Sequence, residues 1–269
     1  MEVGISTACF FGKALLEDSL PMIRKTGAEL CEVFINAPSE SAPAFIRSLK
    51  ESADSLGLKI GTMHPFGIQY ELQLFSNYPR TVDDARKIYE RNIAAAQALG
   101  AEYYIFHGGT AFKFRSKNTL NYKNIGKNLD VLMGIAEDYG VRLAYENVYW
   151  CWYSFPEFCD MILNEVTNDN LCFNLDIKQA VFSGYETAEY IKHMGSRLKN
   201  VHICGVNCKE GEFRTCMPEH GDYPLSDLKK ELLLAGYSGN IILEVYSNNY
   251  DSLDDLKKSF ITVRSCFDS

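Results

Sequence analysis

The stretch "LCFNLDIKQAVFSG" (Leu171 to Gly184) carries the pattern from which the fold can be predicted. Its first part, Leu171–Asp176, is an apolar run that predicts a buried β-strand. This run ends on the charged residue Asp176, and a short polar step then leads into a second apolar patch. The aspartate could be a helix cap, or it could be a ligand that points into a site at the end of the strand. The rest of the chain decides between the two interpretations.

The same alternation of strand and helix runs along all 269 residues. Short apolar or β-branched runs predict eight strands: Val3–Thr7, Leu30–Ile35, Lys59–His64, Tyr103–His107, Arg142–Glu146, Leu171–Asp176, Asn200–Ile203 and Ile241–Tyr246. Amphipathic segments between them predict helices, for example Val82–Leu99, Leu120–Tyr139, Leu225–Ala235 and Leu253–Phe267. Several of these segments end in a glycine, as helix C-caps do.

Alternating units predict a parallel sheet, and eight of them in a chain of this length favour a closed (β/α)8 barrel. No linker or low-complexity segment interrupts the pattern, so we expect a single α/β TIM-barrel domain over residues 1–269. A doubly wound open sheet is the alternative. No GxGxxG motif follows the first strand, which excludes the usual dinucleotide-binding form of that alternative.

The composition limits the partners. A net charge of -8 and a pI near 5.2 disfavour a broad phosphate-binding surface, so no nucleic-acid partner is expected. The chain shows no secretory leader pattern and no apolar stretch of about 20 residues, so we expect neither export nor a membrane span. Nine cysteines with irregular spacing are interpreted as reduced thiols. These features together predict a cytoplasmic protein.

Polar side chains lie in or directly after seven of the predicted strands: Glu32, His64, His107, Glu146, Asp176, His202 and Glu244. Each one alone has an ordinary explanation as a cap, a hydrogen-bonded core histidine or a solvated acid. In a barrel, however, all of them would meet at the C-terminal ends of the strands. Several unpaired acids would repel one another there unless a cation lay among them, and mixed carboxylate and imidazole ligands suit a divalent ion. Asp176 is therefore interpreted as a metal ligand.

Four motifs, "LAYENV", "NLDIKQA", "VHICG" and "IILEVY", resemble the xylose isomerase-like barrels, the superfamily of sugar isomerases, epimerases and endonuclease IV. The approach to the last strand, "HGDYPLSDLKKELLLAGYSGNIILE", is also similar to that family, and the resemblance covers nearly the whole chain. It implies that Glu146, Asp176, His202 and Glu244 together bind one divalent metal ion. Manganese, magnesium or cobalt is the expected ion, with zinc as a further option.

The resemblance also implies a reaction. Glu146 and Glu244 would be the catalytic base and acid as well as ligands, and Asp176 and His202 would be ligands only. The predicted function is that of a metal-dependent isomerase or epimerase acting on a small carbohydrate: a sugar, a sugar phosphate or a polyol-derived ketone. Alternatives are a dehydratase or lyase acting on a related keto-polyol or keto acid, a nuclease like endonuclease IV, and a carbohydrate-binding barrel without catalysis. Whether the protein forms a homo-oligomer stays open.

Two positions depart from the family pattern and affect the substrate. Family members often have a histidine three residues after the aspartate, where this chain has Gln179. Sugar epimerases of the group place an arginine six residues after the metal-binding histidine, where this chain has Cys208. Both positions usually contact substrate, so the substrate class remains open. Lys178 and Arg214 are interpreted as solvated surface groups.

Further residues are predicted to bind substrate. The segment "ENVYWCWYSF" (Glu146 to Phe155) contains Trp150 and Trp152, which could form an aromatic wall for a sugar ring or could serve loop packing or a subunit contact. His64 and His107 are predicted to donate or accept hydrogen bonds to substrate. In endonuclease IV the equivalent histidines bind an additional zinc, so a second metal at His64 and His107 is the alternative.

Overall fold

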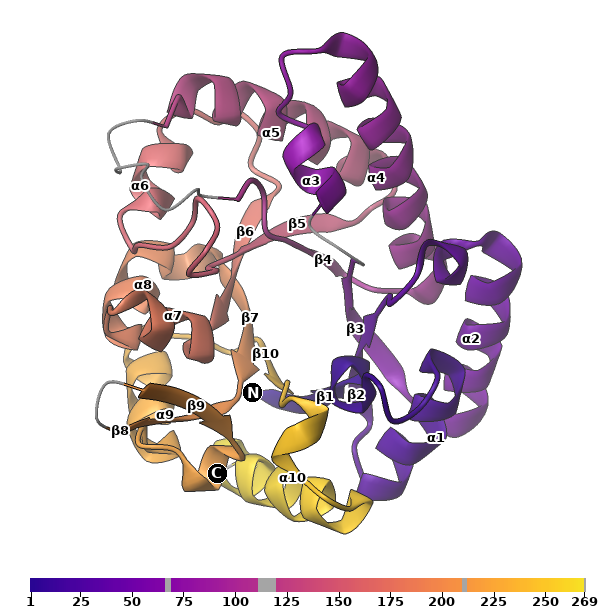
Figure 1. Cartoon of the computed structure of the whole chain (residues 1–269), viewed down its shortest axis with the longest axis vertical. Coiled ribbons are helices and arrows are strands. Elements are labelled where there is room, and N and C mark those ends of the chain that lie inside the picture. The colour runs from indigo at the N-terminus through magenta and orange to yellow at the C-terminus, as the bar shows by residue number, and fades with distance from the viewer. Residues whose placement is uncertain (66–68, 111–119, 210–211, 269) are drawn as a thin grey trace.

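The computed structural model describes residues 1–65, 69–110, 120–209 and 212–268. Eight parallel strands close into a barrel in the order β1-β10-β7-β6-β5-β4-β3-β2, and helices surround it (Figure 1). The strands of the barrel are β1 (Glu2–Ser6), β2 (Leu30–Phe34), β3 (Lys59–His64), β4 (Tyr103–Phe106), β5 (Arg142–Glu146), β6 (Leu171–Asp176), β7 (Leu198–Ile203) and β10 (Asn240–Leu243). The predicted (β/α)8 barrel is confirmed, and the open doubly wound sheet is excluded.

The strand boundaries follow the apolar runs closely. Strands β3, β5 and β6 begin and end at the residues that the sequence pattern predicts. The largest difference is at β10, which ends at Leu243 rather than at Tyr246. Glu244 therefore lies one residue beyond its strand, but its N–H still donates to the carbonyl oxygen of Ile203 at 2.9 Å. This bond fixes the backbone of Glu244 against β7.

Amphipathic helices cover the outer face of the barrel because one side of each is apolar. The helices are α1 (Leu16–Thr26), α2 (Pro43–Leu56), α3 (Gln69–Gln73), α4 (Pro79–Leu99), α5 (Tyr122–Asp138), α6 (Phe158–Leu163), α7 (Ile177–Ser183), α8 (Thr187–Met194), α9 (Leu225–Leu234) and α10 (Leu253–Phe267). Short 3₁₀ turns are η1 (Thr7–Phe10), η2 (Pro38–Ser41), η4 (Gly195–Arg197), η5 (Pro218–His220) and η6 (Ser247–Asn249). In α5, for example, Leu129 and Leu132 are buried in the core. Gly100 follows the last residue of α4 and adopts the left-handed region (φ 81°), where glycine carries no Cβ penalty.

An antiparallel hairpin, β8 (Gly205–Lys209) and β9 (Glu212–Cys216), follows β7 and was not predicted. Its sequence is polar and glycine-containing, so it lacks the apolar run by which the barrel strands were recognised. The hairpin is attached to the loop after β10, because Asn249 donates its side-chain N–H to the carbonyl oxygen of Thr215 at 2.8 Å. Cys208 lies on the hairpin and is exposed.

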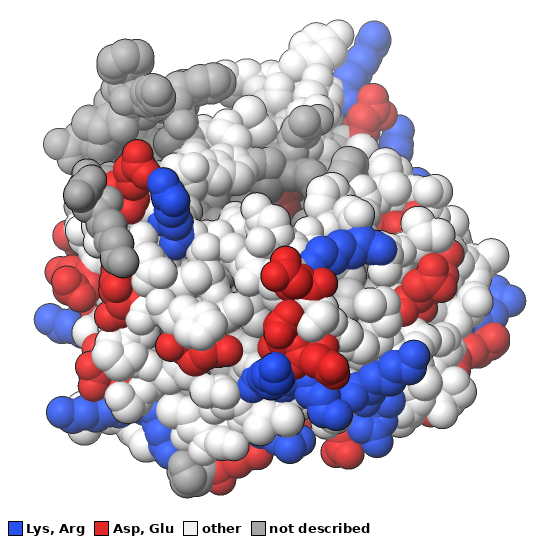
Figure 2. Space-filling model, turned by 60° about the horizontal axis from the view of Figure 1, so that its bottom comes forward, with Lys and Arg blue, Asp and Glu red and all other residues white. Residues whose placement is uncertain are grey.

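The surface and the cysteines agree with the composition. Acidic and basic side chains are interspersed over the face shown in Figure 2. None of the nine cysteines, all of which lie in the described part of the chain, is in a disulfide. A search of the helices in those same residues finds none with the length and apolar character that crossing a membrane requires.

Candidate active site at the C-terminal end of the barrel

The polar strand-end residues converge at the C-terminal end of the barrel, as the parallel strands require. Within the described ranges, three groups of side chains bring ligand atoms within 4.8 Å of one another: His64, His107 and Glu146; Glu32, His202 and Glu244; and Glu146, Asp176 and His202. Glu146 and His202 each belong to two groups and form the centre of the site. The Nδ1 atom of His202 lies 2.8 Å from Oε1 of Glu146 and 3.5 Å from Oε2 of Glu244. These side chains are buried, with Glu244 the most exposed at 12%.

The carboxylate of Asp176 caps a helix with one oxygen, and its role as a metal ligand stays a prediction. Its Oδ1 atom accepts the backbone N–H of Gln179 at 2.9 Å and so caps α7. Its Oδ2 atom points the other way, to the Lys178 ammonium at 3.2 Å. Asn147 fixes the backbone of Asp176 by accepting its N–H at 2.8 Å and donating to its carbonyl at 2.9 Å. The cap and the site therefore use different oxygens of one residue.

Glu32 orients the ring of His202. Its Oε2 atom lies 2.9 Å from Nε2 of His202 and also accepts the hydroxyl of Thr62 at 2.7 Å. Burial would raise the pKa of Glu32, but the charge of His202 and the hydrogen bond to it lower this pKa to about 2. With a carboxylate on Nε2, the imidazole presents Nδ1 to the centre of the site, an arrangement found for histidines that bind metals. The sequence predicted that Glu32 lies at the site, but it did not predict that Glu32 orients His202.

Asn174 and Asn200 support Glu146 from inside the barrel. Asn174 donates its side-chain N–H to Oε1 of Glu146 at 2.7 Å, and Asn200 donates to the side-chain oxygen of Asn174 at 2.8 Å. Both amides are fully buried. Burial would raise the pKa of Glu146, but His202 and the hydrogen bond from His107 hold it well below its usual value. Glu146 is therefore ionised at neutral pH.

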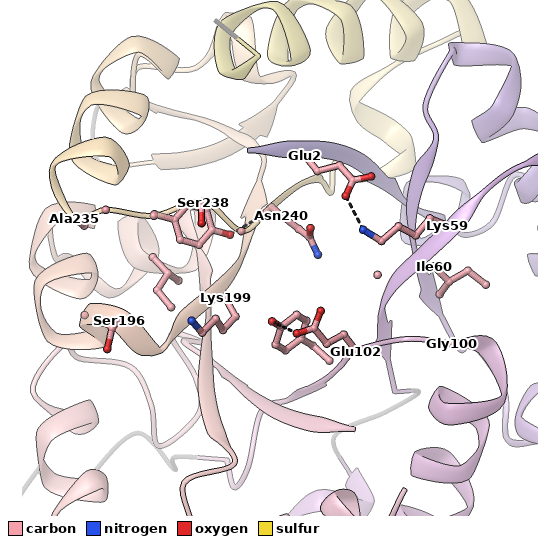
Figure 3. A pocket seen from close by; sticks show the side chains of 17 residues that line it. Glu2, Lys59, Ile60, Gly100, Glu102, Ser196, Lys199, Ala235, Ser238 and Asn240 are labelled. Carbon is pink, nitrogen blue, oxygen red and sulfur yellow. Dashed lines mark hydrogen bonds and ion pairs between the residues drawn. The ribbon is translucent and has the colours of Figure 1, made fainter. Parts of the chain in front are cut away.

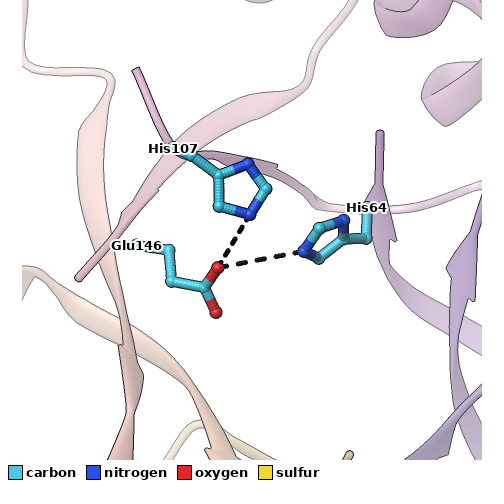
Figure 4. Close-up of side chains that lie close together, drawn as sticks. All are labelled: His64, His107 and Glu146. Atoms are coloured by element: carbon cyan, nitrogen blue, oxygen red, sulfur yellow. Dashed lines mark ion pairs between the residues drawn. The ribbon is translucent and has the colours of Figure 1, made fainter. Parts of the chain in front are cut away.

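His64 and His107 lie on the other side of Glu146 (Figure 4). The Oε2 atom of Glu146 lies 2.9 Å from Nε2 of His107 and 3.8 Å from Nε2 of His64. Phe34 stacks on the ring of His64 with centroids 4.4 Å apart. The backbone N–H groups of His107 and Gly108 both donate to Oε2 of Glu71 in α3, at 3.0 and 2.9 Å. Oε1 of Glu146 thus faces His202, and Oε2 faces His107 and His64.

Glu71 is buried next to His107 and was missed by the sequence reasoning. Burial alone would lower the pKa of His107, but the hydrogen bond to Glu146 and the nearby carboxylate of Glu71, 3.5 Å from Nδ1, raise it to about 10. In the sequence, Glu71 lies neither in a predicted strand nor directly after one, so no pattern connected it with the site. It balances the charge of His107 on the side opposite Glu146.

Lys178 corrects the expectation of a solvated surface group. Its side chain is 4% exposed, and its Nζ atom lies 3.2 Å from Oδ2 of Asp176 and 3.3 Å from Oε2 of Glu244. Nζ also lies 4.8 Å from the centre of the Tyr246 ring. Burial would lower the pKa of Lys178, but the two carboxylates raise it well above its usual value. The expected surface role holds for Arg214, which is exposed and pairs with Glu212.

Asp176 responds to the same neighbours. Burial raises its pKa to about 6; Lys178 opposes this shift, and Glu146 and Glu244 add to it. Several carboxylates and one ammonium thus share a small buried volume. Such crowding of carboxylates is what a divalent cation would relieve.

The remaining residues predicted to bind substrate lie around the loop after β5. Gln179 is half-buried, and its side-chain oxygen accepts the backbone N–H of Tyr149 at 3.3 Å. Trp150 is half-buried. Trp152 is buried in the hydrophobic core, where it packs edge-on against Phe75 with centroids 4.9 Å apart. A Cβ on Gly109 would lie 2.3 Å from the indole of Trp152, so only glycine fits at this position without moving the indole. Trp152 therefore has a clear packing role.

The donor set fits a divalent metal ion. Ligand atoms of Glu146, Asp176 and His202 lie within 4.8 Å of one another, and Glu244 forms a second such group with His202 and Glu32. His202 is the residue that both groups share, and Glu32 contacts its Nε2 atom. Hard carboxylate oxygens with one imidazole nitrogen are ligands that manganese, magnesium, cobalt or zinc accepts. The chain therefore contains candidate metal-binding groups of suitable chemistry.

The family follows from this fold and from a direct comparison. A family model described as "Xylose isomerase-like TIM barrel" matches residues 20–266, and the chain belongs to that family. No curated protein matches the chain by sequence.

Solved structures share the fold at low identity. A D-tagatose 3-epimerase-like protein is 22% identical with a TM-score of 0.78, and the match covers 98% of this chain and 99% of that chain. The D-psicose 3-epimerase of Clostridium cellulolyticum H10, solved with D-tagatose, is 16% identical with a TM-score of 0.80 and covers 99% of both chains. An IolI protein with a bound zinc atom is 18% identical with a TM-score of 0.82, covering 99% of this chain and 98% of that one.

Proposed function

We propose that the protein is a metal-dependent isomerase or epimerase that acts on a sugar, a sugar phosphate or a polyol-derived ketone. The observation that carries the proposal is the approach of two carboxylates, Oε1 of Glu146 and Oε2 of Glu244, to the same nitrogen of His202 from strands β5 and β10. Isomerisation next to a carbonyl needs a group that removes a proton and a group that returns it. Structures of sugar 3-epimerases share the fold over nearly the whole chain, which supports this class of reaction.

Glu146, Asp176, His202 and Glu244 would hold one divalent ion in this proposal. Manganese, magnesium or cobalt is the expected ion, and zinc is also considered because the similar IolI structure contains it. When bound, the ion would polarise the oxygens of the substrate and stabilise the negative charge that forms as the proton leaves. The protein supplies the orientation, since Glu32 fixes the ring of His202 and α7 fixes Asp176.

Glu146 and Glu244 would exchange the proton with the substrate carbon. Glu146 is kept ionised by His202 and His107, which is the state that a base requires. Asn174 and His107 hold one oxygen each, so the carboxylate has little freedom to turn away from the substrate. Glu244 is held less tightly and is the more exposed of the two, which suits a group that must approach from the open side.

The substrate would lie between these carboxylates and the loops at the mouth of the barrel. His64 and His107 would form hydrogen bonds with its hydroxyl groups. Gln179 and Trp150 would contact it from the side of α7 and the loop after β5, with Trp152 packed behind that loop. The substrate is a small carbohydrate in this proposal, and the identity of that carbohydrate is the object of the screen below.

Two measurements test the proposal. Protein purified without chelator should contain close to one equivalent of a divalent ion by elemental analysis. The metal-supplemented protein should then be incubated with ketoses, inositols and keto acids in deuterated water. The expected result is incorporation of deuterium into one substrate, lost on addition of chelator. A protein without metal and without exchange on any of these compounds would be a binding barrel, and the proposal would fail.

The group of His64, His107 and Glu146 supports a second candidate, a phosphodiesterase that uses an additional metal. Nucleic acid is disfavoured by the net charge of -8. The decisive experiment is incubation of the metal-loaded protein with a DNA duplex that contains an abasic site. Chelator-sensitive cleavage at low enzyme concentration would replace the isomerase proposal with this candidate.

A further inference from the structure

Lys178 is the only lysine or arginine that is buried among the residues for which the structure describes burial. It lies in the first turn of α7, two residues after the strand-end Asp176, and its ammonium lies at the mouth of the barrel. Taking an ammonium out of water is costly unless strong partners replace the water. The partners here are Asp176 and Glu244, two residues of the proposed metal site.

The ammonium contacts one carboxylate oxygen of each of two residues in the candidate metal-binding groups. Oδ1 of Asp176 accepts the N–H that caps α7, and Oδ2, which makes no cap contact, lies 3.2 Å from Nζ. Oε2 of Glu244 lies 3.5 Å from Nδ1 of His202 and 3.3 Å from Nζ. A carboxylate oxygen has two lone pairs and can accept from an N–H while it serves another partner. Lys178 is therefore placed at the edge of the proposed coordination site.

A positive charge at this place weakens the attraction of the carboxylates for a divalent cation, because the two cations repel each other. A bound divalent ion would itself neutralise Asp176 and Glu244, so neutralisation alone does not explain a buried lysine here. The ammonium has three N–H groups and contacts two carboxylate oxygens, so one N–H group remains for the substrate. Neither Gln179 nor Cys208 brings a positive charge to the mouth.

We propose that Lys178 is a catalytic residue whose ammonium donates a hydrogen bond to the substrate oxygen that becomes negatively charged during proton transfer. The inference rests on the proposed function. In that step the C–H bond next to the carbonyl breaks, its electron pair forms the C=C bond of an enediolate, and the carbonyl π electrons move to oxygen. The proton goes to a glutamate and is later returned. Lys178 supplies charge to the oxygen and transfers no proton, in the manner of an oxyanion hole.

The test uses a stable anion in place of the enediolate. Acetohydroxamate offers two adjacent oxygens in a plane and binds as an anion, and ethylene glycol offers two adjacent oxygens without charge. Wild type, Lys178→Met and Lys178→Arg are loaded with Co²⁺, and binding of each compound is followed by the visible absorption of the ion. We expect Lys178→Met to weaken acetohydroxamate binding by at least ~10-fold, the value of one hydrogen bond to a charged group. Lys178→Arg should restore part of it, and ethylene glycol should bind all three alike.

Lys13→Met is the matched control. Lys13 also lies over a tyrosine ring, with Nζ 3.8 Å from the centre of Tyr250, but it contacts a backbone carbonyl and no carboxylate of the site. This variant should bind acetohydroxamate as wild type does. The Co²⁺ affinity of every variant is measured separately, and circular dichroism checks the fold. Should Lys178→Met fail to fold, Lys178→Gln removes the same charge with a polar side chain.

The outcomes separate the inference from the function on which it rests. Equal acetohydroxamate binding by cobalt-loaded wild type and Lys178→Met would overturn the role of Lys178 alone. A loss of Co²⁺ affinity of more than ~10-fold in Lys178→Met would also overturn it, since the lysine would then position ligands. Failure of wild type to bind Co²⁺ at all would instead remove the proposed function.

Discussion

The charged side chains at the two ends of the barrel differ in their exposure to solvent. At the N-terminal end, a cavity of about 590 Å³ is bordered by Glu2, Lys59, Glu102 and Lys199 (Figure 3). Its ion pair, between Lys59 and Glu2 at 2.7 Å, is formed by side chains that are 63% and 46% exposed. At the C-terminal end the acids, histidines and Lys178 are almost completely buried and contact one another.

The difference shows that a well-formed cavity need not be the place of chemistry. Water screens the charges of the N-terminal cavity, so each could be replaced at little cost. At the C-terminal end, water is excluded and every charge depends on its neighbours for compensation. Such an arrangement costs stability, and it is retained where desolvated charge is used. The comparison therefore favours the C-terminal end as the place of the proposed reaction, and the following predictions test this hypothesis.

The largest effect is expected for the two glutamates. Glu146→Gln or Glu244→Gln keeps the shape and one ligating oxygen but removes the basic site, so turnover should fall by at least ~100-fold. The measurement is deuterium exchange and product formation with the substrate found in the screen. Glu102→Gln, at the N-terminal cavity, is the control and should retain normal turnover. Near-normal turnover in both site variants would mean that these glutamates are ligands only, and His64 and His107 would be the next candidates for the base.

Asp176→Asn should act through the metal. The amide oxygen can still accept the N–H of Gln179, so α7 stays capped, but the charge on the oxygen that faces the site is lost. We expect metal affinity to fall by at least ~10-fold, the effect known for weaker perturbations around a metal ion. Calorimetric titration measures this, and raising the metal concentration should recover part of the activity. Unchanged affinity would remove Asp176 from the ligand set.

Glu32→Gln tests the support of the imidazole. A glutamine oxygen can still accept from Nε2 of His202, but without charge, so we expect metal affinity to fall by about 10-fold. Thr62→Val removes one hydrogen bond to the same carboxylate and should have a smaller effect in the same direction. Nitrogen NMR of the His202 ring in the loaded protein should show the proton on Nε2. A proton on Nδ1 would contradict this assignment.

The stability of the metal-free protein should depend on pH through His107, at the C-terminal end. The pKa of His107 is raised from 6.5 to about 10, so the protonated histidine contributes stability below pH 6.5. This contribution is lost as the pH rises through about 10. Denaturant midpoints of wild type should therefore decline across this window, and His107→Gln should decline less. An equally steep decline in both proteins would show that other groups cause it.

Lys59→Met should have the smallest effect. Exposed ion pairs contribute about 0–1 kcal/mol, so the free energy of unfolding should change by no more than this, and metal affinity should not change. Urea denaturation and calorimetric titration measure the two quantities. A loss of metal binding in this variant would break the distinction between the two ends of the barrel.

The sequence predicts the barrel well because its strands are buried on both faces and read as apolar runs. It also predicts the strand-end residues of the site, since the topology brings consecutive strand ends to one edge. Asp176 and His202 are placed together in this way, and β6 and β7 pair them directly. What the spacing cannot provide is the direction of a side chain after the strand has ended.

Lys178 and Glu71 illustrate that limit. Both lie on short helices of the C-terminal end, α7 and α3, where no long amphipathic pattern fixes which face is buried. Lys178 was therefore assigned to solvent by its residue type, although two carboxylates compensate its burial. Asn174 was missed for another reason, because an amide inside a buried strand gives no periodic signal. Such residues become visible only when their hydrogen-bond partners from other strands are known.

The two-sided carboxylate of Asp176 has a consequence for how this chain can evolve. Glutamate at this position would keep the charge, but its extra methylene would move both oxygens away from the N–H of Gln179. Serine would keep the cap and lose the charge. Each of these two substitutions thus damages either the helix cap or the negative charge. Neither would therefore be neutral. In a saturation library selected for function, position 176 should tolerate fewer residues than position 244, whose carboxylate caps no helix.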